Sequence, residues 1–364
     1  MNTIIEYLEW RGDLSLEASP FNDVDAAILA RFAYEPFDGI VDSSFRKSIT
    51  VDKVCNAMLN LPDLDKKVLY PKEDIRLIQM MAVSERFKHM RMSGFINDID
   101  LERQTQFSAV VFELDKEANY FVAYRGTDST IIGWKEDLNM GFEFPVPGQI
   151  AALEYFEAAR VGLKEGTFIV GGHSKGGNLS IYACAFASSN CQDSILAIYN
   201  FDGPGFTEDI MQRLEFAAIE NKIRTYVPQF SVIGMILEHT EDYSVVSSNG
   251  VGIMQHELLT WEVTKDSFVC LDKVDKGSRF IDHTLKDWLA GLSMDERMQF
   301  VDTVYKLMTS GDKKNVNQFT ENKLGSANAL MKTYAGLDDK TKKVLRDTFF
   351  KLVKSAGNTI TVKK

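Results

Sequence analysis

The sequence of 364 residues predicts an α/β protein with a mainly parallel central sheet and extra helical regions at both ends. Strand-like and helix-like segments alternate between residues 105 and 280, which is typical of a parallel sheet covered by helices. On either side, residues 1–104 and 281–364 carry apolar side chains at helical spacing. We therefore expect a helical N-terminal region, an α/β core and a helical C-terminal region that pack together as one body.

The N-terminal region is predicted to be mostly helical. Apolar residues recur every three or four positions over residues 23–33 and 72–91, which indicates two helices, and no strong strand pattern occurs before residue 105. The pattern then changes to two apolar runs, 107–114 and 120–124, separated by the turn-like segment DKEAN. These runs predict a hairpin, so we expect the sheet to begin near residue 105.

The remaining elements follow in alternation. The expected helices of the core span residues 149–164, 176–187 and 207–220, and its expected strands span residues 167–170, 195–201, 222–227 and 243–247. Beyond the core, helices are expected at residues 282–292, 294–308 and 339–355. The last segment is basic, with eight Lys or Arg residues against the single acid Asp347 over residues 340–364. Such a helix either packs on the protein with its lysines in water or lies on an anionic membrane surface.

Composition excludes several classes of protein. The chain is 45% hydrophobic and 26% charged, as in ordinary globular proteins, and its net charge of −11 argues against a nucleic-acid binder. The four cysteines have no CxxC spacing, so we expect free thiols, no metal site and no cofactor. The N-terminus has no secretory signal pattern, and no apolar run approaches the roughly 18 residues of a membrane span. These observations predict a cytoplasmic protein.

One motif carries chemistry. The segment TFIVGGHSKGGN runs from a predicted strand into a predicted helix through Gly172-x-Ser174-x-Gly176. This is the pattern of a nucleophile elbow, a turn so sharp that the residues two before and two after the nucleophile must lack bulk. The serine hydroxyl is then held at the N-terminus of a helix, whose positive end favours developing negative charge. Ser174 is therefore the candidate nucleophile; the alternative is a glycine-rich connection with an incidental serine.

A nucleophilic serine needs a base and an orienting acid, which follow it in this chain order in α/β hydrolases. The three histidines after Ser174 are His239, His256 and His283. We favour His256, because it follows the apparent last core strand at residues 243–247, where a loop can reach back over the elbow. His239 lies in an acidic turn and His283 at the start of a helix.

The candidate acid is Asp202, which ends the strand after the elbow in the segment NFDGPG. Carboxyl ends of parallel strands meet at the edge of the sheet where sites form. Glu238 and Asp242 are the alternatives, and a plain turn cap is the other interpretation of Asp202.

Acyl transfer also requires two donors for the oxyanion. One is the backbone N–H of Lys175, the residue after the nucleophile. The other should come from a loop after an earlier strand, and the strand ending in Tyr124-Arg125-Gly126-Thr127 supplies one. Thr127, through its N–H and its hydroxyl, is the candidate; the alternative is a polar strand end with no catalytic role.

Three of these segments together resemble class 3 lipases. The family pattern is a strand ending in F-R-G-S/T, a helix start N-W-x-x-D-L and the elbow G-H-S-x-G-G; this chain has YRGT at 124–127, GWKEDL at 133–138 and GHSKGG at 172–177. The NFDGPG segment looks more like the L-D-P-A-G-P segment of pancreatic-type lipases, whose aspartate is the triad acid. The chain as a whole, including PFNDVDA at 20–26 and MQH at 254–256, resembles the Mbeg-like bacterial family of lipase-like α/β hydrolases.

Two departures from the lipase pattern affect the site. In class 3 lipases the acid follows the next strand, in an N-D-x-V-P segment, whereas the corresponding residues 226–232 here have no carboxylate. This difference favours Asp202. In addition, Lys175 stands where lipases commonly carry an apolar residue, which adds charge beside the site and favours either an anionic substrate or a nearby acid as its partner.

The resemblance and the residues together predict an α/β-hydrolase fold and a serine hydrolase. In this hypothesis Ser174 attacks a carboxylic ester or thioester, His256 transfers the proton, Asp202 orients the imidazole, and Thr127 and Lys175 hold the oxyanion. The expected partner is a small-molecule ester or lipid. The competing hypothesis is an inactive binding or regulatory module on a hydrolase fold, because a fold does not fix a function.

Overall fold

The computed structural model describes residues 2–100, 105–127, 131–237, 239, 242–275, 277–278, 280, 283–284, 287–288, 291–309 and 331–361. By its contacts the chain forms two compact units. The core unit comprises Met1–Asp98, Phe107–Gly126 and Gln149–Asp275, and the second unit comprises Ile99–Gln106, Thr127–Gly148 and Lys276–Lys364.

A nine-stranded sheet forms the centre of the fold, in the order β1-β2-β3-β4-β5-β6-β7-β8-β11. The strands from β4 to β8 are parallel, whereas β1 with β2, β3 with β4 and β8 with β11 pair antiparallel. The predicted α/β class with a mainly parallel sheet is confirmed. The strands span Ile49–Thr50 (β1), Arg91–Asp100 (β2), Thr105–Glu113 (β3), Asn119–Tyr124 (β4), Thr167–His173 (β5), Ile195–Phe201 (β6), Ile223–Pro228 (β7), Tyr243–Val246 (β8) and Cys270–Leu271 (β11), with a separate hairpin of Val263–Thr264 (β9) and Ser267–Phe268 (β10).

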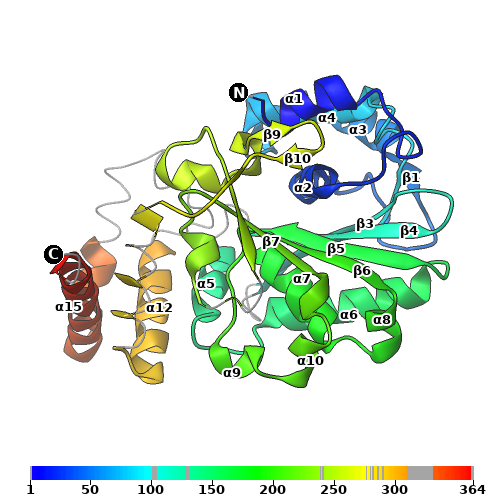
Figure 1. The fold of residues 1–364 in the computed structure, drawn as a ribbon. Coiled ribbons are helices and arrows are strands. Elements are labelled where there is room, and N and C mark those ends of the chain that lie inside the picture. The colour runs from blue at the N-terminus through cyan, green and yellow to red at the C-terminus, as the bar shows by residue number, and fades with distance from the viewer. Residues whose placement is uncertain are drawn as a thin grey trace. The chain divides into compact units, whose positions relative to one another are not determined.

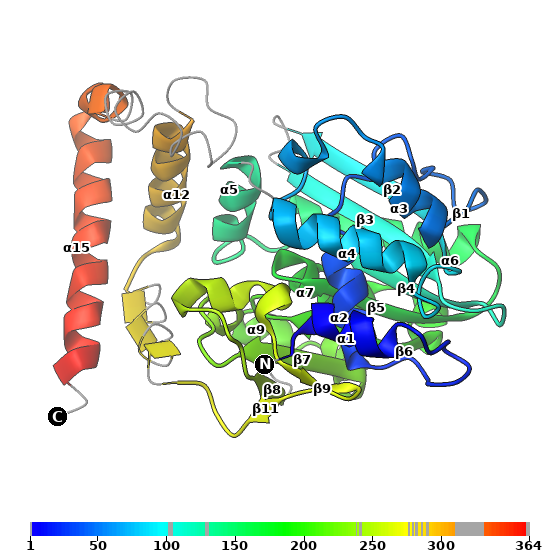
Figure 2. The same ribbon diagram turned by 90° about the horizontal axis from the view of Figure 1, so that it is seen from above.

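Helices cover both faces of the sheet (Figure 1). On one face lie α1 (Ile4–Arg11), α2 (Asp23–Phe32), α3 (Val51–Leu59) and α4 (Pro71–Val83), which Figure 2 shows spread across the strands. On the other face lie α6 (Pro147–Gly162), α7 (Lys175–Phe186), α8 (Ser189–Asp193), α9 (Glu208–Met211) and α10 (Leu214–Ala217). Short 3₁₀ helices span Leu64–Lys66 (η1), Glu220–Lys222 (η2), Ile233–Met235 (η3), Gly252–His256 (η4) and Leu258–Thr260 (η5).

The expectation that the sheet begins near residue 105 is wrong. Strands β1 and β2 precede that position, and α4 ends at Val83 instead of continuing to residue 91. Strand β2 lacks the alternation of apolar and polar residues that predicts a strand, because its buried stretch includes the small residues Ser93 and Gly94. The Gly94 carbonyl accepts a hydrogen bond from the Tyr155 hydroxyl at 2.8 Å. A Cβ atom at Gly94 would lie 2.3 Å from the Phe45 ring, so the close packing replaces the apolar side chains that a strand pattern requires.

Two smaller expectations also differ from the structure. The predicted helix at 207–220 is broken into α9, α10 and η2, and Arg213 separates α9 from α10 because it adopts extended backbone angles. Strand β8 is not the last strand of the sheet, since β11 adds an antiparallel edge of two residues after it.

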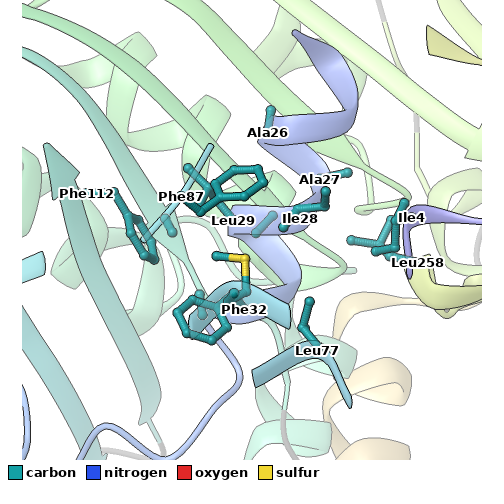
Figure 3. Close-up of a cluster of buried hydrophobic side chains, with 14 of the residues drawn as sticks. Ile4, Ala26, Ala27, Ile28, Leu29, Phe32, Leu77, Phe87, Phe112 and Leu258 are labelled. Atoms are coloured by element: carbon teal, nitrogen blue, oxygen red, sulfur yellow. The ribbon is translucent and has the colours of Figure 1, made fainter. Parts of the chain in front are cut away.

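Helix α2 is the centre of the apolar core. Every residue from Val24 to Phe32 is buried, which is typical of a helix enclosed on all sides. Asn22 caps its N-terminus by accepting hydrogen bonds from the backbone N–H groups of the first turn. Figure 3 shows the apolar side chains of α2 packed between Leu258 and Phe112, which are 146 positions apart in the chain.

The second unit is described by itself. It contains α5 (Ile131–Asn139), α12 (Met294–Met308) and α15 (Asp339–Thr361), and in Figures 1 and 2 α12 and α15 lie side by side. Lys351 of α15 forms an ion pair with Glu296 of α12 at 2.7 Å. The helices expected at 294–308 and 339–355 are present, whereas the one expected at 282–292 lies partly outside the described residues. Of the helices that are described, none combines the length and apolar character needed to cross a membrane.

Candidate active site

Ser174 occupies a sharp turn between strand β5 and helix α7. Its backbone has φ +58° and ψ −133°, a combination that costs energy for a residue with a Cβ atom. The flanking glycines make the turn possible: a Cβ atom at Gly172 would lie 2.4 Å from the carbonyl carbon of Gly176, and one at Gly176 would lie 2.1 Å from the carbonyl oxygen of Tyr124. The motif GxSxG therefore has a steric cause in this chain.

Helix α7 begins directly after this serine. Its first residue is Lys175, so the N–H groups of the first turn lie beside Ser174, at the positive end of the helix. The Lys175 side chain is only 1% exposed, so it does not extend into solvent from the surface.

Asp202 lies in the turn that follows strand β6 and contacts His256. Its Oδ2 is 2.6 Å from His256 Nδ1, and its Oδ1 accepts hydrogen bonds from the Ser231 hydroxyl at 2.5 Å and the Gly234 N–H at 3.2 Å. The carboxylate is completely buried, so these donors replace water around it. Because a carboxylate only accepts, His256 Nδ1 must donate, which leaves Nε2 as the proton-accepting nitrogen of the neutral ring.

The alternative acids and bases do not share this geometry. His239 Nε2 lies 2.8 Å from the Gly234 carbonyl oxygen, and His283 is an exposed residue of the second unit. Asp242 is exposed to solvent, and Glu238 lies outside the described residues.

A second histidine, His173, joins the elbow to the loop that carries His256. Its Nε2 lies 2.7 Å from the His256 carbonyl oxygen, and the two rings pack with centroids 4.4 Å apart. Burial, together with the neighbouring His256, holds the pKa of His173 well below 6.5, so His173 is neutral at pH 7. Its single ring proton is therefore on Nε2, where the carbonyl oxygen requires a donor, and Nδ1 faces the Tyr34 hydroxyl at 3.2 Å.

These contacts place Ser174 and His256 in one cluster, since His173 directly precedes the serine. The Ser174 hydroxyl and the His256 ring, both in the described part of the chain, are not joined by a hydrogen bond. Hydrogen bonds of this kind often tighten only when substrate binds. The contact of His173 with the His256 loop was not predicted from the sequence, in which the signal for it was the position of His173 beside the candidate nucleophile.

Thr127 is the first residue of a segment of the second unit. Its hydroxyl lies 2.7 and 2.6 Å from the two carboxylate oxygens of Asp137, so its one proton is donated to that residue. The preceding residue, Gly126, belongs to the core unit and packs on the elbow: a Cβ atom there would lie 3.0 Å from Ser174 Cβ and 2.5 Å from the His173 carbonyl oxygen. Of the two donors considered for Thr127, the backbone N–H is the one that Asp137 does not engage.

The fold and this arrangement together define a class of protein. A mainly parallel sheet carries a serine at a strand-to-helix turn, an aspartate after the next strand and a histidine after the last parallel strand, which is the organisation of a lipase-like α/β hydrolase. The chain belongs to the Mbeg1-like family, whose family model matches residues 81–306. The resemblance to Mbeg-like proteins is thereby confirmed.

Solved structures that match include lipases. The Rhizomucor miehei lipase propeptide complex is 12% identical, with 61% of this chain and 66% of that chain covered and a TM-score of 0.35. A triacylglycerol lipase described as having a serine protease triad is 13% identical over 62% of this chain and 78% of that one (TM-score 0.37), and Yarrowia lipolytica Lip2 lipase is 9% identical over 47% and 69% (TM-score 0.32). Matches of this strength do not identify an activity. No curated protein matches the sequence.

Proposed function

We propose that this protein is a serine hydrolase that cleaves carboxylic esters through an acyl-enzyme intermediate. The observation that carries this proposal is the contact of the buried Asp202 with His256, in the same cluster as the strained serine of a nucleophile elbow. Ser174 Oγ forms a bond to the substrate carbonyl carbon while His256 Nε2 takes the hydroxyl proton, and the protonated ring then gives that proton to the leaving alcohol. Water repeats the sequence to release the acid and restore Ser174.

Charge on the carbonyl oxygen needs donors that are in place before the reaction. The N–H of Lys175 at the start of α7 is the first donor in this proposal, because it adjoins the nucleophile at the positive end of the helix. The backbone N–H of Thr127 is the second, because Gly126 packs against Ser174 and Thr127 follows it in the chain.

The surroundings of His256 favour an apolar acyl group. Three large apolar side chains that precede it in the chain, Val251, Ile253 and Met254, are 84, 58 and 48% exposed. Exposed apolar groups beside a polar reacting centre suit a substrate that has an apolar chain attached to an ester. A thioester meets the same requirements, since its carbonyl is attacked in the same way.

The direct test is covalent labelling with a fluorophosphonate, followed by intact-mass and peptide mass spectrometry. We expect one adduct on Ser174, none in Ser174→Ala, and normal labelling in the control Ser180→Ala, which removes another buried serine from α7. A set of p-nitrophenyl esters of increasing chain length then measures the acyl preference. A folded wild-type protein that neither reacts with the probe nor cleaves any ester would favour the inactive binding module.

The oxyanion assignment has its own test in Thr127→Ala and Thr127→Ser. Loss of a side-chain oxyanion donor typically costs about a hundredfold or more in kcat. We expect Thr127→Ala to lose much less, because the hydroxyl is donated to Asp137 and the backbone N–H survives the substitution. A hundredfold loss in Thr127→Ala with normal kcat in Thr127→Ser would instead show that the hydroxyl holds the oxyanion.

A further inference from the structure

A buried arginine in helix α2 reaches the residue next to His256. Arg31 is 1% exposed, and three of its nitrogens contact the carboxyl groups of three different residues. Nε lies 2.8 Å from Glu257 Oε1, Nη1 lies 3.2 Å from Glu35 Oε1, and Nη2 forms an ion pair with Asp74. Helix α2, helix α4 and the loop that carries His256 are therefore joined at one guanidinium group.

Arg31 is suited to this task by its charge and its shape. Burial raises the pKa of Glu35 to about 8, so this residue is protonated at pH 7 and Arg31 faces the carboxylates of Asp74 and Glu257. A planar guanidinium can direct separate N–H groups at separate acceptors, whereas the ammonium group of a lysine is a single point that cannot span them.

Glu257 is held through its carboxylate and through its backbone, whose N–H donates to the Met254 carbonyl at 3.2 Å. Its carboxylate accepts the Arg31 hydrogen bond and also caps helix η5 through the N–H of Leu259 at 3.2 Å. The intervening Leu258 is completely buried beside α2, as Figure 3 shows. His256 directly precedes Glu257 and its own carbonyl is held by His173, so two neighbouring contacts restrain its backbone.

We propose that Arg31 and Glu257 are positioning residues of the hydrolase, which hold the backbone of His256 so that its ring stays on Asp202. This inference rests on the proposed function. Neither residue touches the reacting atoms; the pair acts only through the location of His256. The first helices of the chain are then part of the catalytic scaffold and not only a cover for the sheet.

The chain offers a matched control at the other end of the same helix. Arg86 is also fully buried and pairs with Asp25 of α2, with Nε 2.6 Å from Asp25 Oδ1. It also donates to the backbone carbonyls of Ser19 and Pro20 at 2.9 Å. Its partners all lie in the first ninety residues, so Arg86→Lys weakens a comparable buried ion pair that has no direct contact with the His256 loop.

The kinetic experiment compares Arg31→Lys, Glu257→Ala and Glu257→Gln with Arg86→Lys and the wild type. A small displacement of a catalytic group can cost on the order of a hundredfold. We expect Arg31→Lys and Glu257→Ala to lower kcat and the fluorophosphonate labelling rate by about ten- to a hundredfold with KM unchanged. Glu257→Gln should recover part of the loss because its amide oxygen still accepts from Arg31, and folded Arg86→Lys should react at the wild-type rate.

A second measurement does not depend on catalysis. In histidine-labelled protein, ¹⁵N–¹H correlation spectra report which ring nitrogen of His256 carries the proton, with His256→Gln identifying its signal among the five histidines. We expect the Nδ1–H form in the wild type and in Arg86→Lys, and a mixture of tautomers in Arg31→Lys and Glu257→Ala.

The two measurements separate the inference from the proposed function. A wild type that is not labelled overturns the proposed hydrolase, while the tautomer of His256 still reports whether Arg31 and Glu257 hold the ring. If labelling occurs but Arg31→Lys and Glu257→Ala match Arg86→Lys in both rate and tautomer, the positioning role is overturned. A mixture of tautomers already in the wild type also overturns it.

Discussion

The end of strand β6 and the end of helix α2 meet the same loop but contact different parts of it. After β6, Asp202 contacts the His256 ring directly at 2.6 Å. At the end of α2, Arg31 contacts the side chain of the next residue, Glu257, at 2.8 Å. The first contact determines which ring nitrogen carries the proton, and in our proposal the second holds the backbone of the loop. The orientation of the His256 ring and its location are then separate physical problems, which the proposal assigns to Asp202 and Arg31, 171 positions apart in the sequence.

The largest expected effect is a loss of kcat on substitution of Asp202, the residue after strand β6. Asp202→Asn keeps the size of the side chain but allows the wrong tautomer of His256, so we expect kcat to fall about 10⁴-fold while the protein stays folded. Steady-state ester hydrolysis and circular dichroism measure the two quantities. The control is Asp242→Asn, which changes the exposed acid that sequence analysis kept as an alternative. If Asp242→Asn were the inactive variant, the acid would have to be reassigned.

The next effect concerns stability at the α2 end. Arg31→Met leaves Asp74 and Glu257 buried without their cation, and breaking such a pair typically costs about 3–5 kcal/mol. Urea unfolding should therefore show a large loss of unfolding free energy in Arg31→Met and a much smaller one in Asp202→Asn. Equal unfolding free energies of Arg31→Met and Asp202→Asn would contradict the expectation that Arg31 contributes more to stability than Asp202.

A smaller effect is the pH dependence of stability at the α2 end. The pKa of Glu35 is about 8 in the folded protein against an ordinary value of 4.5, because burial disfavours its charged form. The folded protein then binds more protons than the unfolded chain between these values, so the contribution of Glu35 is fully present below about pH 4.5 and is lost as the pH rises through 8.

We expect Glu35→Gln, which is neutral at every pH, to gain stability over the wild type with rising pH, by a few kcal/mol at most, since one pKa unit corresponds to about 1.4 kcal/mol. Urea unfolding at several pH values between 5 and 9 measures this difference. The exposed Glu17→Gln serves as control. Parallel pH profiles for Glu35→Gln and the wild type would contradict a protonated Glu35.

The smallest expected effect is on kcat and concerns the hydrogen bond from Ser231 to Asp202, the residue after strand β6. Ser231 donates to Asp202 Oδ1 at 2.5 Å, and a hydrogen bond to a charged group contributes about 1.5–3 kcal/mol. Because His256 and the Gly234 N–H remain as donors, Ser231→Ala should lower kcat by only about tenfold, which corresponds to about 1.4 kcal/mol. Ser248→Ala, a buried serine bonded to Thr260 instead, should leave kcat unchanged. A loss as large as that of Asp202→Asn would mean that Ser231 fixes the carboxylate alone.

The features that could be predicted from the sequence are those that depend on residues close together in the chain. The elbow is a short-range steric pattern of Gly172, Ser174 and Gly176, and the core strands are apolar runs. Strand β2 was missed because Ser93 and Gly94 bury their backbone against other residues without supplying apolar side chains. The catalytic roles of Ser174, Asp202 and His256 stay predictions until they are measured.

The residues that sequence analysis missed act over long distances along the chain. Arg31 and Glu257 are 226 positions apart, and Tyr34 and His173 are 139 apart. A single sequence has no pattern that joins such positions. The available signal was indirect: an arginine within the apolar segment AAILARF, where a buried charge requires partners.

The burial of helix α2 has a consequence for the synthesis of the protein. The ribosome makes Ala26–Phe32 early, but β6, β7 and Leu258, which pack in the same core, emerge only some 170–230 residues later. Until then the nascent chain carries an apolar helix whose Arg31 lacks Glu257, one of its three partners, and such exposed surface favours misassembly. Completion of the core therefore depends on a loop made more than 220 residues after the helix, and a chain truncated before residue 257 would lack both Glu257, one of the partners of Arg31, and the apolar contact of Leu258 with the core around α2.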